Sequence, residues 1–259
     1  MKEELLINGY ENEKIIANSL NGKRFCEVNP LFNDMLYKLY GKLKNSDLIE
    51  AKVNYNLKKY DLTIKINGVI KRISIKKGIN NSVHGEPIQK FINFLESEHI
   101  EKEFINDFLD YFYADGSFDG TGTKRVSVKE YKESNQDKID RLNLLFNQEN
   151  IIKRCVNRFV TQGNNSKYII DGLIYGTKND FLFLSTDEIE KIILSKKNLY
   201  STGIHFGQLF CQPMTRNLNN NPLYECKRHV VQIKLYTLFD DIIEYKNNYQ
   251  ETYKSEKNF

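Results

Sequence analysis

The sequence contains no tryptophan, and cysteine, proline and histidine each occur only four times in its 259 residues. The cysteines lie far apart and form no Cys-x-x-Cys pair, so they imply neither a disulfide framework nor a zinc site of that spacing. His99, His205 and His229 show no metal-ligand spacing among themselves. No apolar run approaches the roughly 20 residues of a membrane-spanning helix, and the charged first residues do not resemble a signal peptide. We therefore expect a cytoplasmic protein with no membrane partner.

The formal net charge of +4 conceals an uneven distribution of charged side chains. Residues 51–78 carry eight basic side chains and a single acidic one, Asp61, whereas residues 96–119 carry eight acidic side chains and only Lys102 as a base. A basic strip of this kind can neutralise the phosphates of a nucleic acid. Lysines also keep an exposed sheet soluble and unpaired, so charge alone leaves both interpretations open.

The most informative segment is residues 59–76, which we interpret as a β-hairpin. Asn67 and Gly68 stand between two runs of alternating apolar residues, and this dipeptide favours a two-residue turn because both positions need a positive φ. The turn fixes a register in which Asp61 lies opposite Ser74. Side chains alternate between the faces of a strand, so one face should carry mainly apolar residues and the other a polar group. The apolar face would hold Leu62, Ile64, Ile66, Val69, Ile73 and Ile75, with Lys71 as the odd member, and the polar group would be Asp61, Ser74 and Lys76.

This hairpin resembles the catalytic hairpin of the PD-(D/E)xK nuclease superfamily, which includes many type II restriction endonucleases. In that family an aspartate begins one strand and an acidic-x-Lys triplet lies on the next. Here Tyr60-Asp61 stands where Pro-Asp is usual, and Ser74-Ile75-Lys76 stands where the acidic triplet is usual. Some restriction enzymes of the superfamily read Ser-x-Lys and take the missing carboxylate from the following helix. The resemblance covers residues 10–95.

The resemblance implies hydrolysis of phosphodiester bonds with Mg²⁺ as cofactor and Mn²⁺ able to substitute for it. Asp61 would be the principal metal ligand, and the carbonyl of Ile75 would be a backbone ligand. Lys76 would orient the attacking water and contact the scissile phosphate. The alternative is that Asp61 and Lys76 form an ordinary cross-strand pair, worth only ~0.2–1 kcal/mol.

Two glutamates are candidates for the missing acid. Glu86 is followed by Pro87, and proline is favoured in the first helical turn, so we expect Glu86 to cap a helix over residues 87–95 and to serve as the second metal ligand. Glu13 falls on the apolar stripe of a helix expected over residues 11–20, where it would orient Lys76 or bind a second metal. A glutamate at the edge of that stripe is the equally simple alternative.

Other residues are candidates for contact with phosphate or DNA, although ordinary hydrogen bonding would also explain a histidine in a polar loop. These candidates are Ser74, His84, Lys59 and Arg72. In the distal half, basic residues such as Arg125, Arg216 and Arg228 could read base edges, because arginine makes the commonest contacts of that kind.

Helices are also expected over residues 30–44, 98–113 and 134–146, and strands over residues 48–56, 167–184 and 229–235, with a polar loop at residues 80–85. This order predicts an α/β protein, and the resemblance implies a restriction-endonuclease-like mixed β-sheet core flanked by helices, with a C-terminal α+β region.

The turn-rich loop at residues 115–122 suggests a boundary between a nuclease core at residues 1–114 and a C-terminal region at residues 115–259 that completes the fold and contributes DNA recognition. The loop also resembles the start of an EF-hand calcium loop. Its twelfth position is Val126, however, which cannot supply the bidentate carboxylate. A single, bulky variant of a homing-endonuclease motif around Leu109 is a weaker alternative, so we expect a polar connecting loop.

The sequence thus predicts a metal-dependent endonuclease of the type II restriction kind that acts on double-stranded DNA. A homodimer would match the two-fold symmetry of a palindromic site, and a cognate methyltransferase is a possible partner. The alternative is a degenerate nuclease core that binds nucleic acid or acts as a scaffold, and Ser74 in place of an acid keeps that alternative open. An RNA substrate also remains open.

Overall fold

The computed structural model describes residues 8–56, 58–78, 81–122, 124–163, 167–201, 203–214, 216 and 221–256. The chain folds into two compact units that alternate along the sequence. Unit 1 comprises Met1–Ile79 and Val156–Lys191, and unit 2 comprises Asn80–Cys155 and Ile192–Phe259. This division differs from the boundary at residue 114 that the turn-rich loop suggests, because strands from residues 172–185 join the sheet that the N-terminal hairpin begins.

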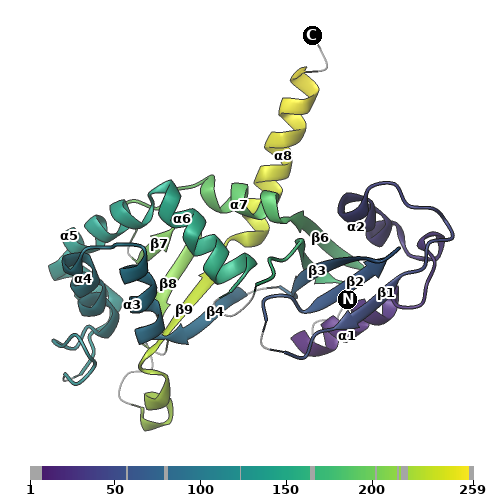
Figure 1. Ribbon diagram of the computed structural model, residues 1–259. Coiled ribbons are helices and arrows are strands. Elements are labelled where there is room, and N and C mark those ends of the chain that lie inside the picture. The colour runs from purple at the N-terminus through teal and green to yellow at the C-terminus, as the bar shows by residue number, and fades with distance from the viewer. Residues whose placement is uncertain are drawn as a thin grey trace. The chain divides into compact units, whose positions relative to one another are not determined.

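Unit 1 is built on a five-stranded mixed sheet (Figure 1). Its strands are β1 (Glu50–Val53), β2 (Leu62–Ile66), β3 (Val69–Lys76), β5 (Gly172–Thr177) and β6 (Asp180–Ser185), in the order β1-β2-β3-β5-β6. The pairing of β3 with β5 is parallel and the other pairings are antiparallel, so the predicted mixed sheet is confirmed. The helical segments of this part of the chain are α1 (Gly9–Leu20), η1 (Phe25–Glu27), α2 (Pro30–Tyr40), the π-helical turn η2 (Asn157–Thr161) and the start of α7 (Thr186–Leu194).

The hairpin has the predicted register, with Ile66 paired to Val69 and Leu62 paired to Ile73. Asn67 and Gly68 have φ values of 49° and 83°, as a two-residue turn of this type requires. The predicted apolar face is buried except at Val69, which is 50% exposed because it lies beside the turn at the tip of the hairpin. The buried members are Leu62, Ile64, Ile66, Ile73 and Ile75.

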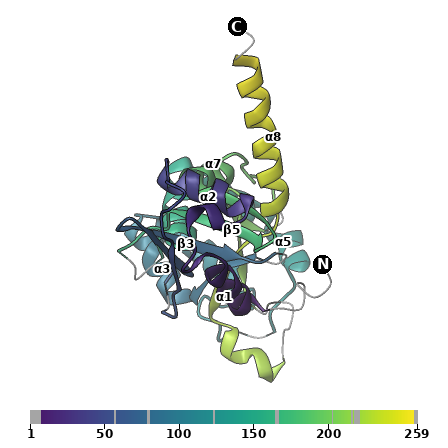
Figure 2. The ribbon, with the colours of Figure 1, turned by 90° about the vertical axis from the view of Figure 1, so that its right-hand side faces the viewer.

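Two capped helices complete the core of unit 1, with α1 beside β1 and α2 beside β6 (Figures 1 and 2). Asn8 forms a capping box at the start of α1, and Asn29 caps α2 ahead of a proline in its first turn. Buried Asn12 donates its Nδ2 to the carbonyl of Gly176 in β5 at 2.9 Å. This long-range bond fixes the rotation of α1 about its axis, and therefore decides where the next residue, Glu13, points.

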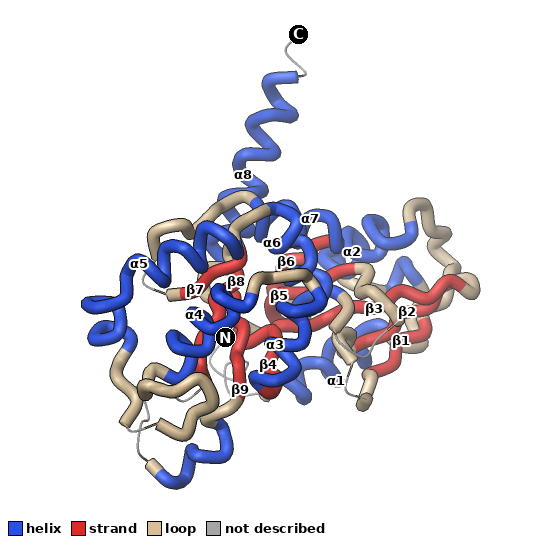
Figure 3. The backbone as a smooth tube through the Cα atoms, turned by 60° about the vertical axis from the view of Figure 1, so that its left-hand side comes forward, coloured by secondary structure: helices blue, strands red, loops and turns tan. Residues whose placement is uncertain are grey.

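Unit 2 contains a four-stranded antiparallel sheet in the order β4-β9-β8-β7, against which α3, α4 and α5 pack (Figure 3). Its strands are β4 (Asn81–Pro87), β7 (Ile204–Phe206), β8 (Leu209–Pro213) and β9 (Val230–Leu235). The helical segments are α3 (Ile88–Ser97), α4 (Lys102–Tyr113), α5 (Val128–Phe146), α6 (Glu149–Val156), η4 (Pro222–Lys227) and α8 (Leu238–Glu256). Aromatic rings fill the layer between helices and sheet, with centroids of Phe91 and Phe108 4.9 Å apart and those of Phe146 and Phe206 4.7 Å apart.

The expected polar loop at residues 80–85 is wrong, because Asn81–Pro87 form strand β4. The partner that makes this possible is β9, whose Val231 pairs with Glu86 from far along the chain. Glu86 is therefore a strand residue and does not cap a helix, and α3 begins only after Pro87.

The last helix, α8, follows β9 and extends away from the sheet of unit 2 in all three views (Figures 1, 2 and 3). Its first turns are anchored by the buried side chains of Leu238 and Ile242. No helix in the described part of the chain is both long and apolar enough to span a bilayer.

Candidate active site

Asp61 lies immediately before β2, where the first strand of the hairpin begins. Its backbone N–H donates to the carbonyl of Ile73, the residue that pairs with Leu62, at 2.9 Å. Its side-chain Oδ2 accepts hydrogen bonds from Ser74 Oγ at 3.1 Å and from the backbone N–H of Ile75 at 2.6 Å, and Lys76 Nζ lies 4.0 Å from the same oxygen. The structure therefore brings Asp61, Ser74 and Lys76 together on one side of the hairpin.

These contacts leave half of the Asp61 carboxylate open. Both hydrogen bonds end on Oδ2, and within the described residues Oδ1 accepts none. Ser74 is only 4% exposed, so its hydroxyl orients the carboxylate. A direct contact between Ser74 and phosphate stays a prediction.

Helix α1 supplies a second carboxylate at this point. Burial raises the pKa of Glu13 to about 7, the charge of Asp61 acts in the same direction, and the charge of Lys76 lowers it. Asp61 and Lys76 are the two charged groups that act on Glu13, so its carboxyl lies on the side of the hairpin that carries them. The buried face of α1 consists of Asn12, Ile16, Ala17 and Leu20, and half-buried Glu13 stands at its edge. Glu13 thus lies at the edge of the apolar face of α1 and also faces Asp61 and Lys76 of the hairpin.

The residues present fit a hard divalent cation. Ile75 donates its N–H to Asp61, and the N–H and C=O of one strand residue point to the same edge, so the Ile75 carbonyl also faces the aspartate side. The described residues contain no group of three or more His, Cys, Asp or Glu side chains that could hold a metal. The site offers two carboxylates and a carbonyl, and Mg²⁺ needs only one or two carboxylates because it keeps several of its waters.

The comparisons with known proteins bear on this architecture. No protein-family model matches the chain, and no curated protein matches it at a significant level. Among solved structures, the chain is similar to a crystal structure of the restriction endonuclease MspI bound to its cognate DNA, with a TM-score of 0.50 and 15% sequence identity over 87% of both chains. The fold is restriction-endonuclease-like. At this identity the likeness extends to the fold alone.

In this restriction-endonuclease-like fold, the other basic candidates of unit 1 take different places. Lys59 donates its Nζ to the carbonyl of Phe159 in η2 at 2.5 Å, so it ties the hairpin to that turn. Arg72 lies over the ring of Tyr168 with its guanidinium carbon 4.0 Å from the ring centroid. No local pattern in the sequence indicates the contact of Arg72 with Tyr168, because these residues lie almost a hundred positions apart.

Glu86 and His84 belong to unit 2. The side chain of Glu86 is 3% exposed, and its Oε2 lies 3.4 Å from His84 Nε2. Burial raises the pKa of the Cys211 thiol, and the charge of Glu86 acts in the same direction. The strand pairing of β4 with β9 accounts for the burial of Glu86, and the role of Glu86 as a metal ligand stays a prediction.

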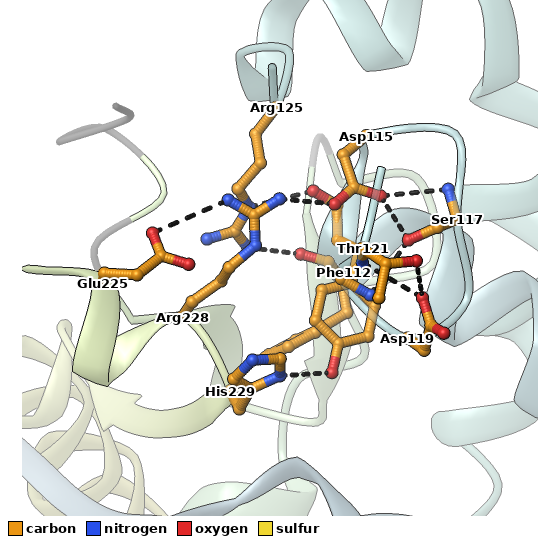
Figure 4. Close-up of polar contacts among 11 residues, drawn as sticks. Phe112, Asp115, Ser117, Asp119, Thr121, Arg125, Glu225, Arg228 and His229 are labelled. Atoms are coloured by element: carbon orange, nitrogen blue, oxygen red, sulfur yellow. Dashed lines mark hydrogen bonds and ion pairs between the residues drawn. The ribbon is translucent and has the colours of Figure 1, made fainter. Parts of the chain in front are cut away.

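The loop at residues 115–122 forms a polar cluster within unit 2 (Figure 4). Asp115 accepts hydrogen bonds from Arg228 at 2.5 Å and from Ser117, and Asp119 accepts two from Thr121. Asp115 and Asp119, which the EF-hand resemblance would make calcium ligands, therefore accept hydrogen bonds from protein groups. The cluster ties the loop to the segment before β9.

Two of the arginines that could read base edges lie at the end of α4 and cap it. Arg125 donates to the carbonyl of Phe112 (Figure 4) and to that of Tyr113, and Arg216 donates to that of Tyr111. The last carbonyls of a helix have no intrahelical partner and carry the negative end of its dipole, which explains why cations gather there. Burial and the neighbouring guanidinium groups lower the pKa of Arg125 to about 10. Arg125 and Arg216 are each only 3% exposed, so both are buried capping residues and neither is an exposed base-reading or surface residue.

Replacing Glu13 with glutamine should change the pH dependence of stability. Between the unperturbed pKa of 4.5 and the folded pKa of about 7, the folded protein keeps a proton that the unfolded chain has released, so stability falls as pH rises. The variant lacks this effect. In urea unfolding with chelator present, it should be more stable than the wild type at pH 8 by on the order of 1 kcal/mol, after allowance for solvent screening.

Well below pH 4.5, both the folded and the unfolded wild-type chain carry a protonated Glu13, so the two proteins should converge in stability. A Glu13→Gln variant that is less stable than the wild type at pH 8 would show that the carboxylate is stabilised by its surroundings and not destabilised by burial and by the charge of Asp61.

Proposed function

We propose that this protein is a Mg²⁺-dependent endonuclease that hydrolyses phosphodiester bonds of double-stranded DNA, of the type II restriction kind. The observation that carries the proposal is the convergence of Asp61, Glu13 and Lys76 beside a Ser-x-Lys strand within a restriction-endonuclease-like fold. The absent acid of the usual triplet is supplied here by α1. The roles below rest on that geometry and on the chemistry of the groups.

The metal would be held by Asp61 Oδ1, the Glu13 carboxylate and the Ile75 carbonyl. When bound, Mg²⁺ supplies Lewis-acid stabilisation of the phosphoryl oxygens and a more acidic water. Ser74 and the Ile75 N–H keep the Asp61 carboxylate in one orientation through their bonds to Oδ2. Orientation of this kind matters because a preorganised charge does not have to rearrange during the reaction.

Lys76 would act on the phosphate and on the attacking water. Its ammonium group lies 4.0 Å from Asp61 Oδ2 and has room to move, because the side chain is 25% exposed. A positive charge here stabilises the additional negative charge that develops on the phosphoryl oxygens. In the overall reaction a P–O bond to water forms, the bond from phosphorus to the leaving 3′ oxygen breaks, and that oxygen takes up a proton.

The test is cleavage of supercoiled plasmid by the purified protein. We expect nicked and linear products with Mg²⁺ or Mn²⁺ and none with EDTA. Competition by duplex DNA and by duplex RNA then decides the substrate class, and we expect DNA to compete. If the plasmid stays supercoiled and the protein binds DNA tightly, the alternative of a degenerate core that binds nucleic acid is favoured instead. The observation that supports this alternative is Ser74, which stands where an acid is usual.

The assignment to a restriction system adds two expectations. Discrete fragments from a long DNA would indicate recognition of a defined site. If that site is a palindrome, two protein copies should assemble on one duplex, which sedimentation of the protein with the duplex would measure. DNA modified by a cognate methyltransferase at the same site should then resist cleavage.

A further inference from the structure

A group of cationic and aromatic side chains in unit 1 lies next to the candidate active site. The guanidinium carbon of Arg72 is 4.0 Å from the ring centroid of Tyr168 and 6.0 Å from that of Tyr60. Lys58 Nζ lies 5.6 Å and 5.8 Å from the centroids of the same two rings and donates to the hydroxyl of Tyr60 at 3.3 Å. We call Lys58, Tyr60, Arg72 and Tyr168 the Arg72 platform.

The guanidinium of Arg72 is oriented but carries no acceptor. Within the described residues it makes no hydrogen bond and no ion pair, although the residue is half-buried. The adjacent carboxylate, Asp171, is already committed, because it accepts the backbone N–H of Arg72 at 2.8 Å and pairs with Lys71 at 3.0 Å. The guanidinium of Arg72 therefore lies over a ring with its fork of N–H donors available for an outside acceptor.

The chemistry of the platform selects its ligand. A planar guanidinium binds the oxygens of a phosphate with two parallel hydrogen bonds, and stacking on an aromatic ring fixes its plane in advance. The surrounding segment, residues 51–78, has eight basic side chains and one acid, which favours a polyanion over an isolated carboxylate. These features fit a backbone phosphate of a nucleic acid.

The position of Arg72 gives the location of that phosphate. Arg72 precedes Ser74 by two residues on β3 and lies on the same face of the strand, so the two are separated by about 7 Å. A DNA strand rises ~3.4 Å along its axis per nucleotide. A strand whose scissile phosphate lies at Asp61 and Lys76 would thus present a neighbouring phosphate to the platform.

We propose that the Arg72 platform binds a backbone phosphate of the substrate strand within a few nucleotides of the scissile one, with Arg72 and Lys58 as contacts and Tyr168 as the positioning residue for the guanidinium. This inference rests on the proposed function for the identity of the strand, and adds a binding site that no catalytic role explains. Tyr60 and Tyr168 hold the cations in place and do not stack on bases.

The experiment measures binding without cleavage. Fluorescence anisotropy of a labelled duplex, with Ca²⁺ in place of Mg²⁺, gives the dissociation constant of the full-length protein at several salt concentrations. Arg72→Ala should weaken binding roughly tenfold at moderate salt and reduce the slope of log Kd against log salt by about 0.9, the loss of one phosphate contact. Arg72→Lys should keep the slope but bind more weakly, because it retains the charge without the fork.

Two further variants separate contact from positioning. Tyr168→Leu removes the ring and should weaken binding severalfold with an unchanged salt slope, since every charge remains. Lys38→Ala is the matched control, because Lys38 is an exposed lysine of unit 1 that pairs with Glu188, and its affinity and slope should equal those of the wild type. Lys58→Ala changes an exposed residue and serves as the second test of the platform if Arg72→Ala does not fold, as judged by circular dichroism.

The outcomes distinguish this inference from the nuclease proposal. An unchanged dissociation constant and salt slope in a folded Arg72→Ala or Lys58→Ala variant overturns the platform, even if the wild type cuts DNA. A wild type that binds duplex through Arg72 but leaves plasmid intact supports the platform and contradicts the nuclease proposal. A wild type that binds no duplex overturns the platform outright.

Discussion

Replacing Asp61 with asparagine should lower the rate of Mg²⁺-dependent DNA cleavage by on the order of 10³-fold or more, since metal-ion stabilisation of the transition state is worth several kcal/mol. The substitution keeps the shape of the side chain and an oxygen that can accept from Ser74 and from the Ile75 N–H, so the hairpin should stay folded. It removes the negative charge that a metal requires. Single-turnover cleavage of plasmid DNA measures the effect.

The matched control is Asp180→Asn, which changes an exposed carboxylate at the start of β6 in the same unit and should cut at the wild-type rate. Binding of Mn²⁺, followed by isothermal calorimetry, gives a readout that does not depend on activity, and Asp61→Asn should weaken it. Unchanged cleavage by Asp61→Asn, with the thermal midpoint also unchanged, would refute the assignment of Asp61 as the principal ligand.

The hairpin part of this site could be predicted because the turn and the alternation of apolar residues are short-range sequence patterns. The Asn67-Gly68 turn specifies the register from Leu62 to Ile73, and extending that register predicts the contact of Asp61 with Ser74 on the side of Lys76. The alternation of apolar residues then decides which face is buried. Only Val69 departs from it, because burial requires cover that the tip of a hairpin does not have.

The parts that depend on distant segments could be predicted only incompletely. Residues 81–87 are polar and look like a loop until β9 supplies hydrogen-bonding partners, and this pairing also buries Glu86. The division into two units depends on the parallel pairing of β3 with β5, which no short-range pattern encodes. The arginines at the end of α4 are read as surface residues from sequence because their acceptors are backbone carbonyls.

Glu13 stands between these cases. Its position beside an apolar stripe is a local signal that a charge lies against a buried surface, and the sequence therefore singles it out. Its proximity to Asp61 depends on the rotation of α1, which the bond from Asn12 to Gly176 fixes. A polar residue on the buried face of a helix, such as Asn12, indicates an anchor of this kind but not the distant residue to which it bonds.

Replacing Lys76 with methionine should also lower the cleavage rate by on the order of 10³-fold, because one preorganised charge at a phosphoryl oxygen is worth about 2.7–4 kcal/mol. Methionine keeps an unbranched side chain that can pack as the lysine stem does, so folding should be preserved. Metal binding should not weaken, since the substitution removes a cation from beside Asp61 and Glu13 and leaves both carboxylates in place. Calorimetry with Mn²⁺ beside single-turnover cleavage measures the two effects together.

This dissociation separates the two halves of the proposed site: Asp61→Asn loses cleavage and metal binding together, whereas Lys76→Met loses cleavage alone. Lys76 lowers the pKa of Glu13, so replacing Lys76 should raise that pKa. In the absence of metal, the fall in stability that Glu13 causes with rising pH should then extend to higher pH. Lys65→Met is the control, because Lys65 lies on the paired strand and forms its ion pair with Glu50. If Lys76→Met cuts DNA as fast as Lys65→Met, the ammonium group does not act on the phosphate, and its place beside Asp61 reflects only a cross-strand ion pair.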